Sequence, residues 1–590
     1  MPGAEISRRE GLQILAGGTG APVILTRQQL PNLLLIITDD QGWFDVGIHG
    51  NPHIETPVMD RIARQGVRFS RFYCSPVCTP TRAALITGRH YQRTGAIDTY
   101  KGRDTLAADE TTLAEVLRRR GYRTACIGKW HLGRYMRYHP NERGFEEFFG
   151  FWQYGFINRY DDSDELWHNK RPVITTGYVT DVLTDRAITF LEQNRNRPFF
   201  LYLAYNAPHS PYLVPDPYIA RYLKKGLPLQ EARIYGMISS LDDNIGRLLA
   251  ALQRWKIAEN TLVIFMTDNG GVSRYYSCGL RGNKGSVYEG GIRVPFFMCW
   301  PGRFPAGAVV DAMAQHIDVF PTFCELIGAP LPGDRKIDGR SLLPLIEKGG
   351  GESPHTRLFH QWNRVRPLMD PPTDPEEAPP DERKAFRPNW AVHDRRGYKL
   401  ISTGELFDLT RDPGEQHDLA AVQADGVREL RAAFEDFFRD VTAGLSYRRV
   451  PIEVGREDEN PVEIDLTWGE AVGKKVRPTY RHYNRDTIEG WSEPGDAVRW
   501  AVEVVWPGPY QVTLEYGCNP EDAGSRFQIT LGRARLEGIV QPTAGRLVFE
   551  PFVAGRLELE RGPATLEMRP VAIRGRELMA LHKIWLRRLG

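Results

Sequence analysis

The chain has 590 residues, of which 41% are hydrophobic and 25% charged, and 76 basic side chains nearly balance 74 acidic ones, for a formal net charge of +2. This length exceeds what one hydrophobic core supports and indicates two or three domains. So small a net charge gives no electrostatic footprint for nucleic acid, and no apolar run approaches the roughly 20 residues of a membrane helix. We therefore expect neither a nucleic-acid partner nor a transmembrane segment.

Residues 1–30 contain the paired arginines Arg8 and Arg9, followed by a weakly apolar stretch rich in glycine and alanine. This pattern is typical of a twin-arginine export signal, and a disordered tail is the alternative interpretation. Such a signal directs a folded bacterial protein out of the cytoplasm. We therefore expect a periplasmic or secreted protein, with a cytoplasmic location as the alternative.

Strand and helix patterns alternate over residues 31–350. Short apolar runs, which are consistent with strands buried on both faces, alternate with amphipathic helical segments. This order predicts an α/β catalytic domain with a mostly parallel sheet and helices on both faces. The predicted strands lie at 31–40, 122–127, 198–209 and 261–271, and the helices at 112–120, 182–194 and 234–256.

Two further units follow this α/β region. A strand pair and a helix predict a smaller α+β subdomain over residues 351–450, interrupted at 366–388 by a Pro- and acid-rich stretch that we expect to be a disordered insertion, or else a long loop near the site mouth. Residues 460–590 alternate with period two between Gly/Pro turns, which predicts a β-sandwich. Its aromatic residues are expected in the core, with stacking on sugars as the alternative: Trp491, Trp500, Trp506 and Tyr510.

Polar side chains follow three of the predicted strands: Asp39 and Asp40, His209, and Asp268 with Asn269. Ligands of open α/β sheets bind beyond the carboxyl ends of the strands, so we expect these side chains to converge. The three carboxylates and one amide suit Ca²⁺ or Mg²⁺ better than a softer metal. The alternative is that they only cap turns.

Cys78 lies at the start of a predicted helix, with Thr79 as N-cap and Pro80 as the first helical residue. The positive helix end and Arg82 in the first turn favour a bound anion and lower the pKa of a thiol. Cys74 has no evident partner and is expected to be a small buried residue. The odd number and irregular spacing of the cysteines disfavour a disulfide framework: Cys74, Cys78, Cys126, Cys278, Cys299, Cys324 and Cys518.

Three further residues have side chains suited to anion chemistry. Lys129 and His131 lie two apart after a predicted strand and can share a face, while Lys284 occurs in a Gly-rich loop. Lysine binds anions and imidazole acts as a general base. A structural histidine and solvated lysines are the alternatives.

Together, these stretches indicate a protein family more specifically than any one of them does alone. "CTPTR", "GKWHLG", "APH", "TDNGG" and "KGSVYEGGIRVPF" occur in this order. They resemble the blocks of the formylglycine-dependent, arylsulfatase-like sulfatases of the alkaline phosphatase superfamily, over roughly residues 31–420. Thr81 stands where that family more often has serine, and the hydroxyl is kept.

The resemblance implies an alkaline-phosphatase-like fold and a modified nucleophile. Cys78 would be oxidised to Cα-formylglycine by a formylglycine-generating or anaerobic sulfatase-maturating enzyme. One hydroxyl of the hydrated aldehyde would attack sulfur and form a formylglycine-sulfate intermediate, and His131 would deprotonate the other and expel sulfate. The metal, usually Ca²⁺ with Mg²⁺ as the alternative, would be bound by five residues: Asp39, Asp40, Cys78, Asp268 and Asn269.

By the same resemblance, Arg82 orients the formylglycine, Lys129 and Lys284 bind the sulfate oxygens, and His209 contacts the leaving oxygen. The expected function is hydrolysis of a sulfate ester of a saccharide or an aryl alcohol. The alternatives are a phosphonate or phosphate ester hydrolase of the same superfamily and a carbohydrate-binding protein without activity. Substrate specificity is expected from loops, with these candidates: Tyr154, Tyr160, Asp161, Asp162, His360 and Trp362.

Overall fold

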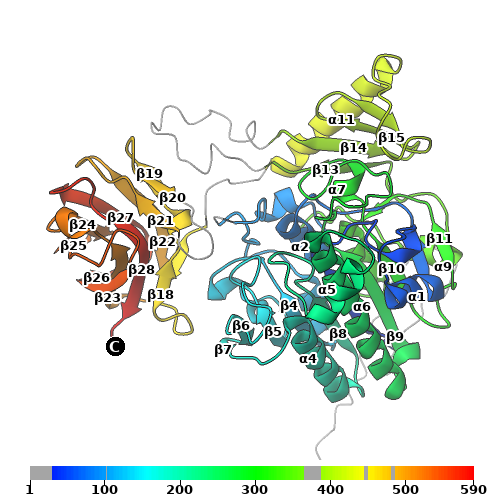
Figure 1. Cartoon of the computed structure of the whole chain (residues 1–590), viewed down its shortest axis with the longest axis horizontal. Coiled ribbons are helices and arrows are strands. Elements are labelled where there is room, and N and C mark those ends of the chain that lie inside the picture. Colours follow the sequence, from blue (N-terminus) through cyan, green and yellow to red (C-terminus); the bar gives the residue numbers. More distant parts are fainter. Residues whose placement is uncertain (1–29, 101, 364–386, 444–449, 480–485) are drawn as a thin grey trace, which may run out of the picture.

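The computed structural model describes residues 30–590 except 101, 364–386, 444–449 and 480–485 (Figure 1). Nearly all of the predicted export signal at 1–30 and of the Pro- and acid-rich stretch at 366–388 lies outside the described residues. Within the described ranges, no helix has both the length and the apolar character that crossing a membrane requires.

A ten-stranded sheet forms the centre of the larger part of the molecule. From β9 to β5 the neighbouring strands are parallel, and β10 and β6 are antiparallel to their inner neighbours. The prediction of a mostly parallel sheet is therefore confirmed. In spatial order the strands are β11 (Ala308–Val310), β2 (Val67–Phe69), β10 (Phe296–Cys299), β9 (Thr261–Thr267), β1 (Asn32–Thr38), β8 (Phe199–Ala204), β4 (Arg123–Lys129), β5 (Glu147–Phe151), β6 (Leu166–His168) and β7 (Arg171–Val173).

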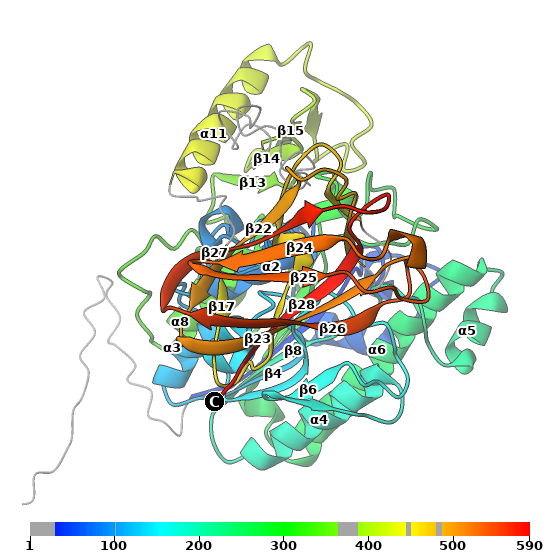
Figure 2. The ribbon, with the colours of Figure 1, turned by 90° about the vertical axis from the view of Figure 1, so that its left-hand side faces the viewer.

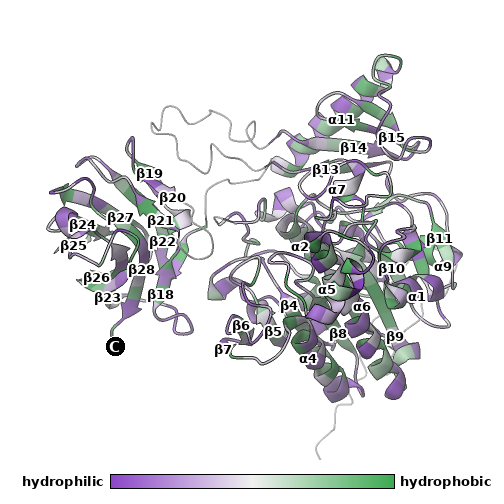
Figure 3. Ribbon diagram, viewed as in Figure 1, coloured by the Kyte–Doolittle hydropathy of each residue, from purple (hydrophilic) through white to green (hydrophobic). Residues whose placement is uncertain are grey.

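Strand β1 shows why both faces of this sheet must be covered. Each of its residues is buried, and successive side chains point to opposite faces. Leu33 and Leu35 therefore belong to one hydrophobic cluster and Leu34 and Ile36 to another. Figure 3 shows the hydrophobic residues of the central strands between more polar helices.

Helices cover both faces of the sheet, as the alternating sequence pattern predicts (Figure 1). Residues of α3 and α8 belong to the first cluster and residues of α4 and α6 to the second. The helices of this region are α1 (Pro57–Gln65), α2 (Cys78–Thr87), α3 (Leu113–Arg119), α4 (Val179–Asn194), α5 (Asp216–Leu223), α6 (Leu229–Arg254), α7 (Glu289–Ile292), α8 (Val319–Leu326) and α9 (Leu343–Lys348).

A smaller α+β unit follows, as predicted. Its four-stranded antiparallel sheet comprises β13 (Arg357–Gln361), β14 (Trp390–Asp394), β15 (Tyr398–Ile401) and β16 (Leu406–Asp408). Helix α11 (Ala424–Thr442) packs on this sheet, where Trp390 stacks on Phe434 with ring centroids 4.1 Å apart. A two-stranded pair, β3 (Phe72–Tyr73) and β12 (Ala314–Gln315), lies outside both sheets.

The C-terminal sandwich consists of two sheets, which Figure 2 shows in front of the central sheet. One contains β17 (Ile452–Val454), β19 (Glu470–Val472), β22 (Ala497–Val504), β24 (Arg526–Leu531), β25 (Ala534–Ile539) and β27 (Gly562–Ala572). The other contains β18 (Val462–Ile464), β20 (Arg477–Thr479), β21 (Thr487–Glu489), β23 (Gly508–Gly517), β26 (Glu550–Leu559) and β28 (Ala580–Arg588). The predicted all-β sandwich is thus confirmed.

The aromatic residues of the sandwich mostly form its core, as expected. Trp491, Trp500 and Tyr510 are at most 1% exposed and belong to its hydrophobic cluster. Trp506 is 52% exposed and lies under the guanidinium of Arg588. The three buried rings therefore have no face left for a sugar.

Candidate active site

The carboxyl ends of the central strands bring the predicted site residues together. Asp39 and Asp40 follow β1, and Asp268 and Asn269 follow β9, its parallel neighbour. His209 follows β8 on the other side of β1. Parallel strands end at the same edge, so residues more than two hundred positions apart in sequence become neighbours.

Four fully buried charges form what we call the buried ion cluster: Asp39, Arg82, Lys129 and Asp268. Lys129 Nζ lies 2.5 Å from Asp39 Oδ2, and Arg82 Nη2 lies 2.8 Å from Asp268 Oδ2 and 3.5 Å from Asp39 Oδ2. Burial opposes the charge on Arg82, but the Asp268 and Asp39 carboxylates outweigh it and raise the pKa of the guanidinium. The two carboxylates therefore keep the buried guanidinium charged.

Asp40 is the centre of an adjacent group. It has a positive φ of 66°, and its carboxylate accepts hydrogen bonds from Lys284 Nζ at 2.8 Å and Asn269 Nδ2 at 2.9 Å. Although burial acts to raise the pKa of Asp40, Lys284 and His209 lower it below its usual value. His209 Nε2 lies 3.8 Å from the same carboxylate, and burial lowers the pKa of His209 to about 4.

Two oxygens at this site are buried without a hydrogen-bond partner among the described residues: Asp39 Oδ1 and Asn269 Oδ1. Burial and the neighbouring Asp268 raise the pKa of Asp39 to about 8. Ligand atoms of Asp39, Asp40 and His209 lie within 4.8 Å of one another. Unsatisfied oxygens beside mutually repelling carboxylates are the environment that a hard cation stabilises, so the donor set fits Ca²⁺ or Mg²⁺.

Helix α2 begins two residues earlier than the sequence predicts. Its N-cap is Val77, whose carbonyl accepts from Thr81 N at 3.3 Å, and Cys78 is the first helical residue. Thr79 does not cap the helix, because its hydroxyl donates to the carbonyl of His131 at 3.2 Å. The expected fall in the thiol pKa is wrong as well: burial outweighs Lys129 and Lys284 and raises the pKa of Cys78.

His131 is held against Cys78 in one tautomer. Its Nδ1 lies 3.5 Å from Cys78 Sγ, and its Nε2 lies 2.8 Å from the carbonyl oxygen of Thr99. A carbonyl only accepts, so Nε2 carries the proton and Nδ1 presents a lone pair to Cys78. Burial, followed by Lys129, lowers the pKa of His131 far below its usual value, so the ring is neutral. A Cβ on Gly155 would lie 2.3 Å from His131 Cε1, so that glycine backbone packs directly on the ring.

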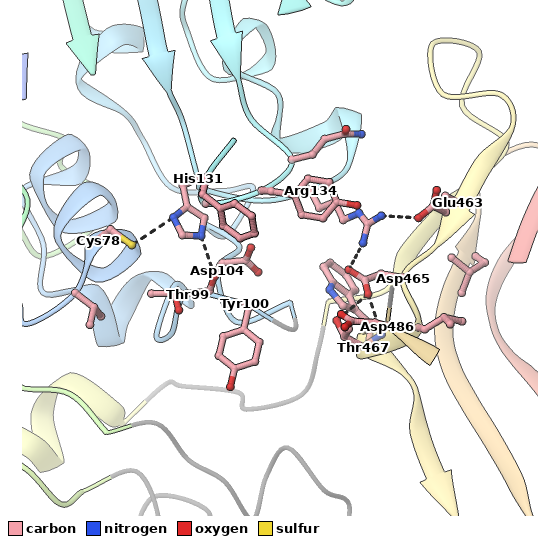
Figure 4. Close-up of a pocket in the computed structure, with 18 of the residues that line it drawn as sticks. Cys78, Thr99, Tyr100, Asp104, His131, Arg134, Glu463, Asp465, Thr467 and Asp486 are labelled. Carbon is pink, nitrogen blue, oxygen red and sulfur yellow. Dashed lines mark hydrogen bonds and ion pairs between the residues drawn. The ribbon is translucent and has the colours of Figure 1, made fainter. Parts of the chain in front are cut away.

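A pocket of about 660 Å³ opens above these residues (Figure 4). Cys78, His131, His209 and Lys284 line its inner end. Its outer walls come from Thr99, Tyr100 and Asp104, from residues 153–156 and from the C-terminal sandwich. Sequence reasoning missed the sandwich wall, because its residues lie more than 300 positions after His131 and form no motif with it: Glu463, Asp465, Asp486, His582 and Lys583.

The residues predicted to determine substrate specificity lie in different parts of the structure, and not all of them line the pocket. Tyr154 lines the pocket. Tyr160 is fully buried and donates to the carbonyl of His209 at 2.9 Å, so it supports that loop from below. Asp161 and Asp162 are exposed in a turn outside the pocket, where Asp162 accepts from Gly177 N at 2.8 Å.

The two candidates of the α+β unit also lie outside the pocket lining. His360 is 3% exposed and faces the carbonyl of Cys74 at 3.2 Å through Nδ1, and burial lowers its pKa far below the usual value. Trp362 packs near Gly285, beside Lys284. Cys74 is buried with Sγ 3.3 Å from the carbonyl of Thr267, as expected for a small packing residue, and all seven cysteines are free.

Comparison with known proteins agrees with this geometry. The family model described as Sulfatase matches residues 31–329. The N-acetylgalactosamine-6-sulfatase of Canis lupus familiaris is 36% identical over 382 residues, 58% of this chain and 70% of that protein. The steryl-sulfatase of Mus musculus is 32% identical over 516 residues, 69% of this chain and 81% of that protein.

Solved structures show the same fold. The crystal structure of Ps i-CgsB in complex with k-i-k-neocarrahexaose has a TM-score of 0.62 and 30% identity, and covers 71% of this chain and 95% of its own. A phosphonate monoester hydrolase, SpPMH from Silicibacter pomeroyi, has a TM-score of 0.52 at 20% identity over 70% of this chain and 95% of its own, which shows the fold alone.

The fold and the polar site at its strand ends define a hydrolase of the alkaline phosphatase superfamily. Within it, the chain belongs to the sulfatase family. It is a sulfuric ester hydrolase, which converts a sulfate ester to an alcohol and inorganic sulfate.

The buried ion cluster predicts a large stability effect at Arg82. Arg82→Ala should lower the free energy of unfolding by about 3–5 kcal/mol, because it leaves the buried Asp268 carboxylate without its cation. Urea denaturation measures this. The matched control is Arg439→Ala, since Arg439 is paired with Asp436 but its side chain is 75% exposed. Equal effects of the two variants would contradict a cluster held together by buried charge.

Proposed function

We propose that Cys78 is oxidised to Cα-formylglycine and that the modified residue attacks the sulfate ester. One observation supports this most strongly: the Cys78 side chain lies at the inner end of the pocket, 3.5 Å from an unprotonated imidazole nitrogen of His131. The raised pKa of the thiol argues against an unmodified thiolate nucleophile. The hydrated aldehyde supplies two hydroxyl groups on one carbon, an oxygen nucleophile that a thiol lacks.

His131 Nδ1 accepts the proton of a hydroxyl at the position of Cys78 Sγ. The Nε2 hydrogen bond to the carbonyl of Thr99 keeps the ring in the tautomer this needs and stabilises the imidazolium that results. Because the pKa of His131 is far below its usual value, the base is neutral and available throughout the neutral range.

His209 contacts the leaving oxygen. Its Nδ1 donates to the carbonyl of Ser210 at 2.7 Å, so Nε2 faces the pocket and gains a proton only when the ring is charged. Burial and Lys284 lower the pKa of the ring to about 4. A bound sulfate ester adds negative charge, which favours the protonated ring and therefore donation from Nε2 to the departing alcohol.

Lys129 and Lys284 bind the sulfate oxygens, and Arg82 orients the modified Cys78. The positions of these cations are fixed before substrate arrives, since Lys129 is bonded to Asp39 and Lys284 to Asp40. Charges already in place can stabilise the developing negative charge without reorganisation.

We propose that Ca²⁺, with Mg²⁺ as the alternative, occupies the same edge of the sheet. Asp39, Asp40, Asp268, Asn269 and the modified Cys78 would hold it. The unsatisfied buried oxygens of Asp39 and Asn269 support this assignment. When bound, the ion supplies positive charge that polarises a sulfate oxygen and acidifies a bound hydroxyl.

The proposed substrate is a sulfated saccharide, with an aryl sulfate as the alternative. The names of its relatives support this, because they include an N-acetylgalactosamine-6-sulfatase, and Ps i-CgsB was crystallised with k-i-k-neocarrahexaose. The pocket size, about 660 Å³, is within the range of small-ligand sites.

We further propose three functional units: a catalytic domain over residues 31–350, a subdomain over 351–450 and the sandwich over 460–590. The sheets support these boundaries, because each unit has strands that pair only within it: the ten-stranded sheet, the four-stranded sheet of β13–β16 and the two sheets of the sandwich. A formylglycine-generating or anaerobic maturating enzyme is the proposed partner. The paired Arg8 and Arg9 support bacterial export by the twin-arginine route after this modification.

Cys78→Ala should abolish sulfate release from p-nitrophenyl sulfate, because no aldehyde can form at that position. Cys74→Ala is the matched control: Cys74 is an equally buried cysteine four residues earlier, and its variant should retain most of the activity. Ion chromatography of released sulfate measures both. Equal activity of Cys78→Ala and wild type would contradict the proposal, and so would much faster hydrolysis of an aryl phosphonate than of the aryl sulfate.

Chelation should destabilise the protein, because the carboxylates at the strand ends lose the ion that offsets their repulsion. At a free Ca²⁺ concentration of about 100 times Kd the ion contributes about 2.7 kcal/mol, so EDTA should lower the unfolding temperature and Ca²⁺ should restore it.

Calorimetry of two asparagine variants tests whether the site is the proposed one. The shift on chelation should shrink in Asn269→Ala and persist in Asn244→Ala, a buried asparagine that bonds to Asp181 instead. An identical shift in both variants would contradict the proposed metal ligands.

A further inference from the structure

A second cavity adjoins the active-site pocket, between the catalytic region and the C-terminal sandwich. It has a volume of about 360 Å³, and we call it the outer groove. Four residues line both cavities, so the two meet at these side chains: Arg134, Gln153, Tyr154 and Glu463. Cys78 lies at the inner end of the active-site pocket, and an ester with its sulfate there extends its alcohol portion towards the outer groove.

Three segments distant in sequence form the outer groove. Trp167, Lys170 and Pro172 come from the β6–β7 hairpin, which Figure 1 shows on the side of the catalytic region that faces the sandwich. Residues 134–136 come from the loop after β4. Residues 458–461, Glu463 and Trp585 come from the sandwich. The groove therefore exists only because the sandwich packs at this place.

Hydrogen bonds fix both sides of the outer groove. Lys170 Nζ donates to Asp458 Oδ2 at 2.7 Å, and Met136 N donates to Glu459 Oε2 at 3.0 Å. Arg134 donates to Glu463 Oε1 at 2.6 Å, where the groove meets the active-site pocket (Figure 4). These bonds hold the walls in place before a ligand arrives, which lowers the ordering cost of binding.

Two tryptophan side chains line the outer groove. Trp167 comes from β6 and Trp585 from β28, and both are only partly buried. By contrast, Trp491 and Trp500 in the sandwich core are at most 1% exposed. Aromatic rings with one face left open suit the apolar face of a sugar ring.

Polar groups lie among these rings. Gln153 supplies an amide that both donates and accepts hydrogen bonds, and Glu459 supplies a carboxyl group. Concave sites that combine aromatic faces with a few polar groups are typical of small-molecule binding. Sugar units have the apolar ring faces and the hydroxyl groups that such a lining can contact.

We propose that the outer groove binds the sugar units next to the sulfated one, so that the enzyme acts on sulfated oligosaccharide chains, with Trp167 and Trp585 as stacking residues. This inference rests on the proposed sulfated-saccharide function. The sandwich then acts at the active site, as one side of the cleft that holds the chain.

The test uses full-length, Ca²⁺-loaded enzyme. Sulfate release is measured on p-nitrophenyl sulfate, on disaccharides from chondroitin sulfate, heparan sulfate and carrageenan, and on the hexasaccharide with the repeat of the fastest disaccharide. Per sulfate group, kcat/KM should be about tenfold higher for the hexasaccharide than for the disaccharide, the gain that one stacked ring supplies. Trp167→Ala and Trp585→Ala should each lower the hexasaccharide to p-nitrophenyl sulfate ratio of kcat/KM by about tenfold, mainly through a higher KM.

Trp506→Ala is the matched control, because Trp506 is a 52% exposed tryptophan of the same sandwich outside both cavity linings, and its loss should leave the ratio unchanged. Equal kcat/KM per sulfate for the two chain lengths would overturn the inference. So would a ratio that the two groove variants leave unchanged, or that Trp506→Ala lowers as much as they do. Release from p-nitrophenyl sulfate but from no saccharide would instead contradict the proposed sulfated-saccharide function, and the inference with it.

Discussion

The site depends on one constraint: four ionisable groups with no solvent exposure must balance one another, namely Asp39, Lys129 and Asp268 at the ends of β1, β4 and β9, and Arg82 on α2. Removing Arg82 leaves the Asp268 carboxylate without its cation, and removing Asp39 leaves Lys129 without its carboxylate. The parallel order of β1, β9, β8 and β4 is what brings them together. The central sheet, with helices over both faces, therefore fixes the site as well as supporting the core.

The loop after β4 links this cluster to the rest of the molecule. It begins with Lys129 in the buried ion cluster, continues to His131 beside Cys78, and ends with Arg134 and Tyr135 in contact with the sandwich. The ion pair with Asp39, the proposed general base and the contact with the sandwich thus follow one another within seven residues. The sandwich therefore contacts the loop that contains His131, although the two are more than 300 residues apart in sequence.

Much of this architecture could be predicted from the sequence, because it follows from local pattern. The continuous apolar run of β1 predicts a strand buried on both faces, and the period-two alternation after residue 460 predicts a sandwich. The residues at strand ends could be placed near one another from topology alone. Their roles came from motif resemblance and remain proposals.

Other features could not be predicted, since they depend on contacts distant in sequence. The Thr79 hydroxyl bonds to His131 instead of capping α2, and burial overcomes the positive helix end at Cys78. The pairing of Arg134 with Glu463 and Asp465 spans more than 300 residues and has no local signal.

The proposed chemistry requires residue 78 to act as an aldehyde and not as a thiol. The most direct measurement is mass spectrometry of the peptide that contains residue 78, from fully active enzyme treated with a hydrazide reagent. We predict a sulfur-free residue with the mass of formylglycine that forms a hydrazone. An intact cysteine at position 78, alkylated by iodoacetamide in enzyme that releases sulfate at its full rate, would contradict the claim.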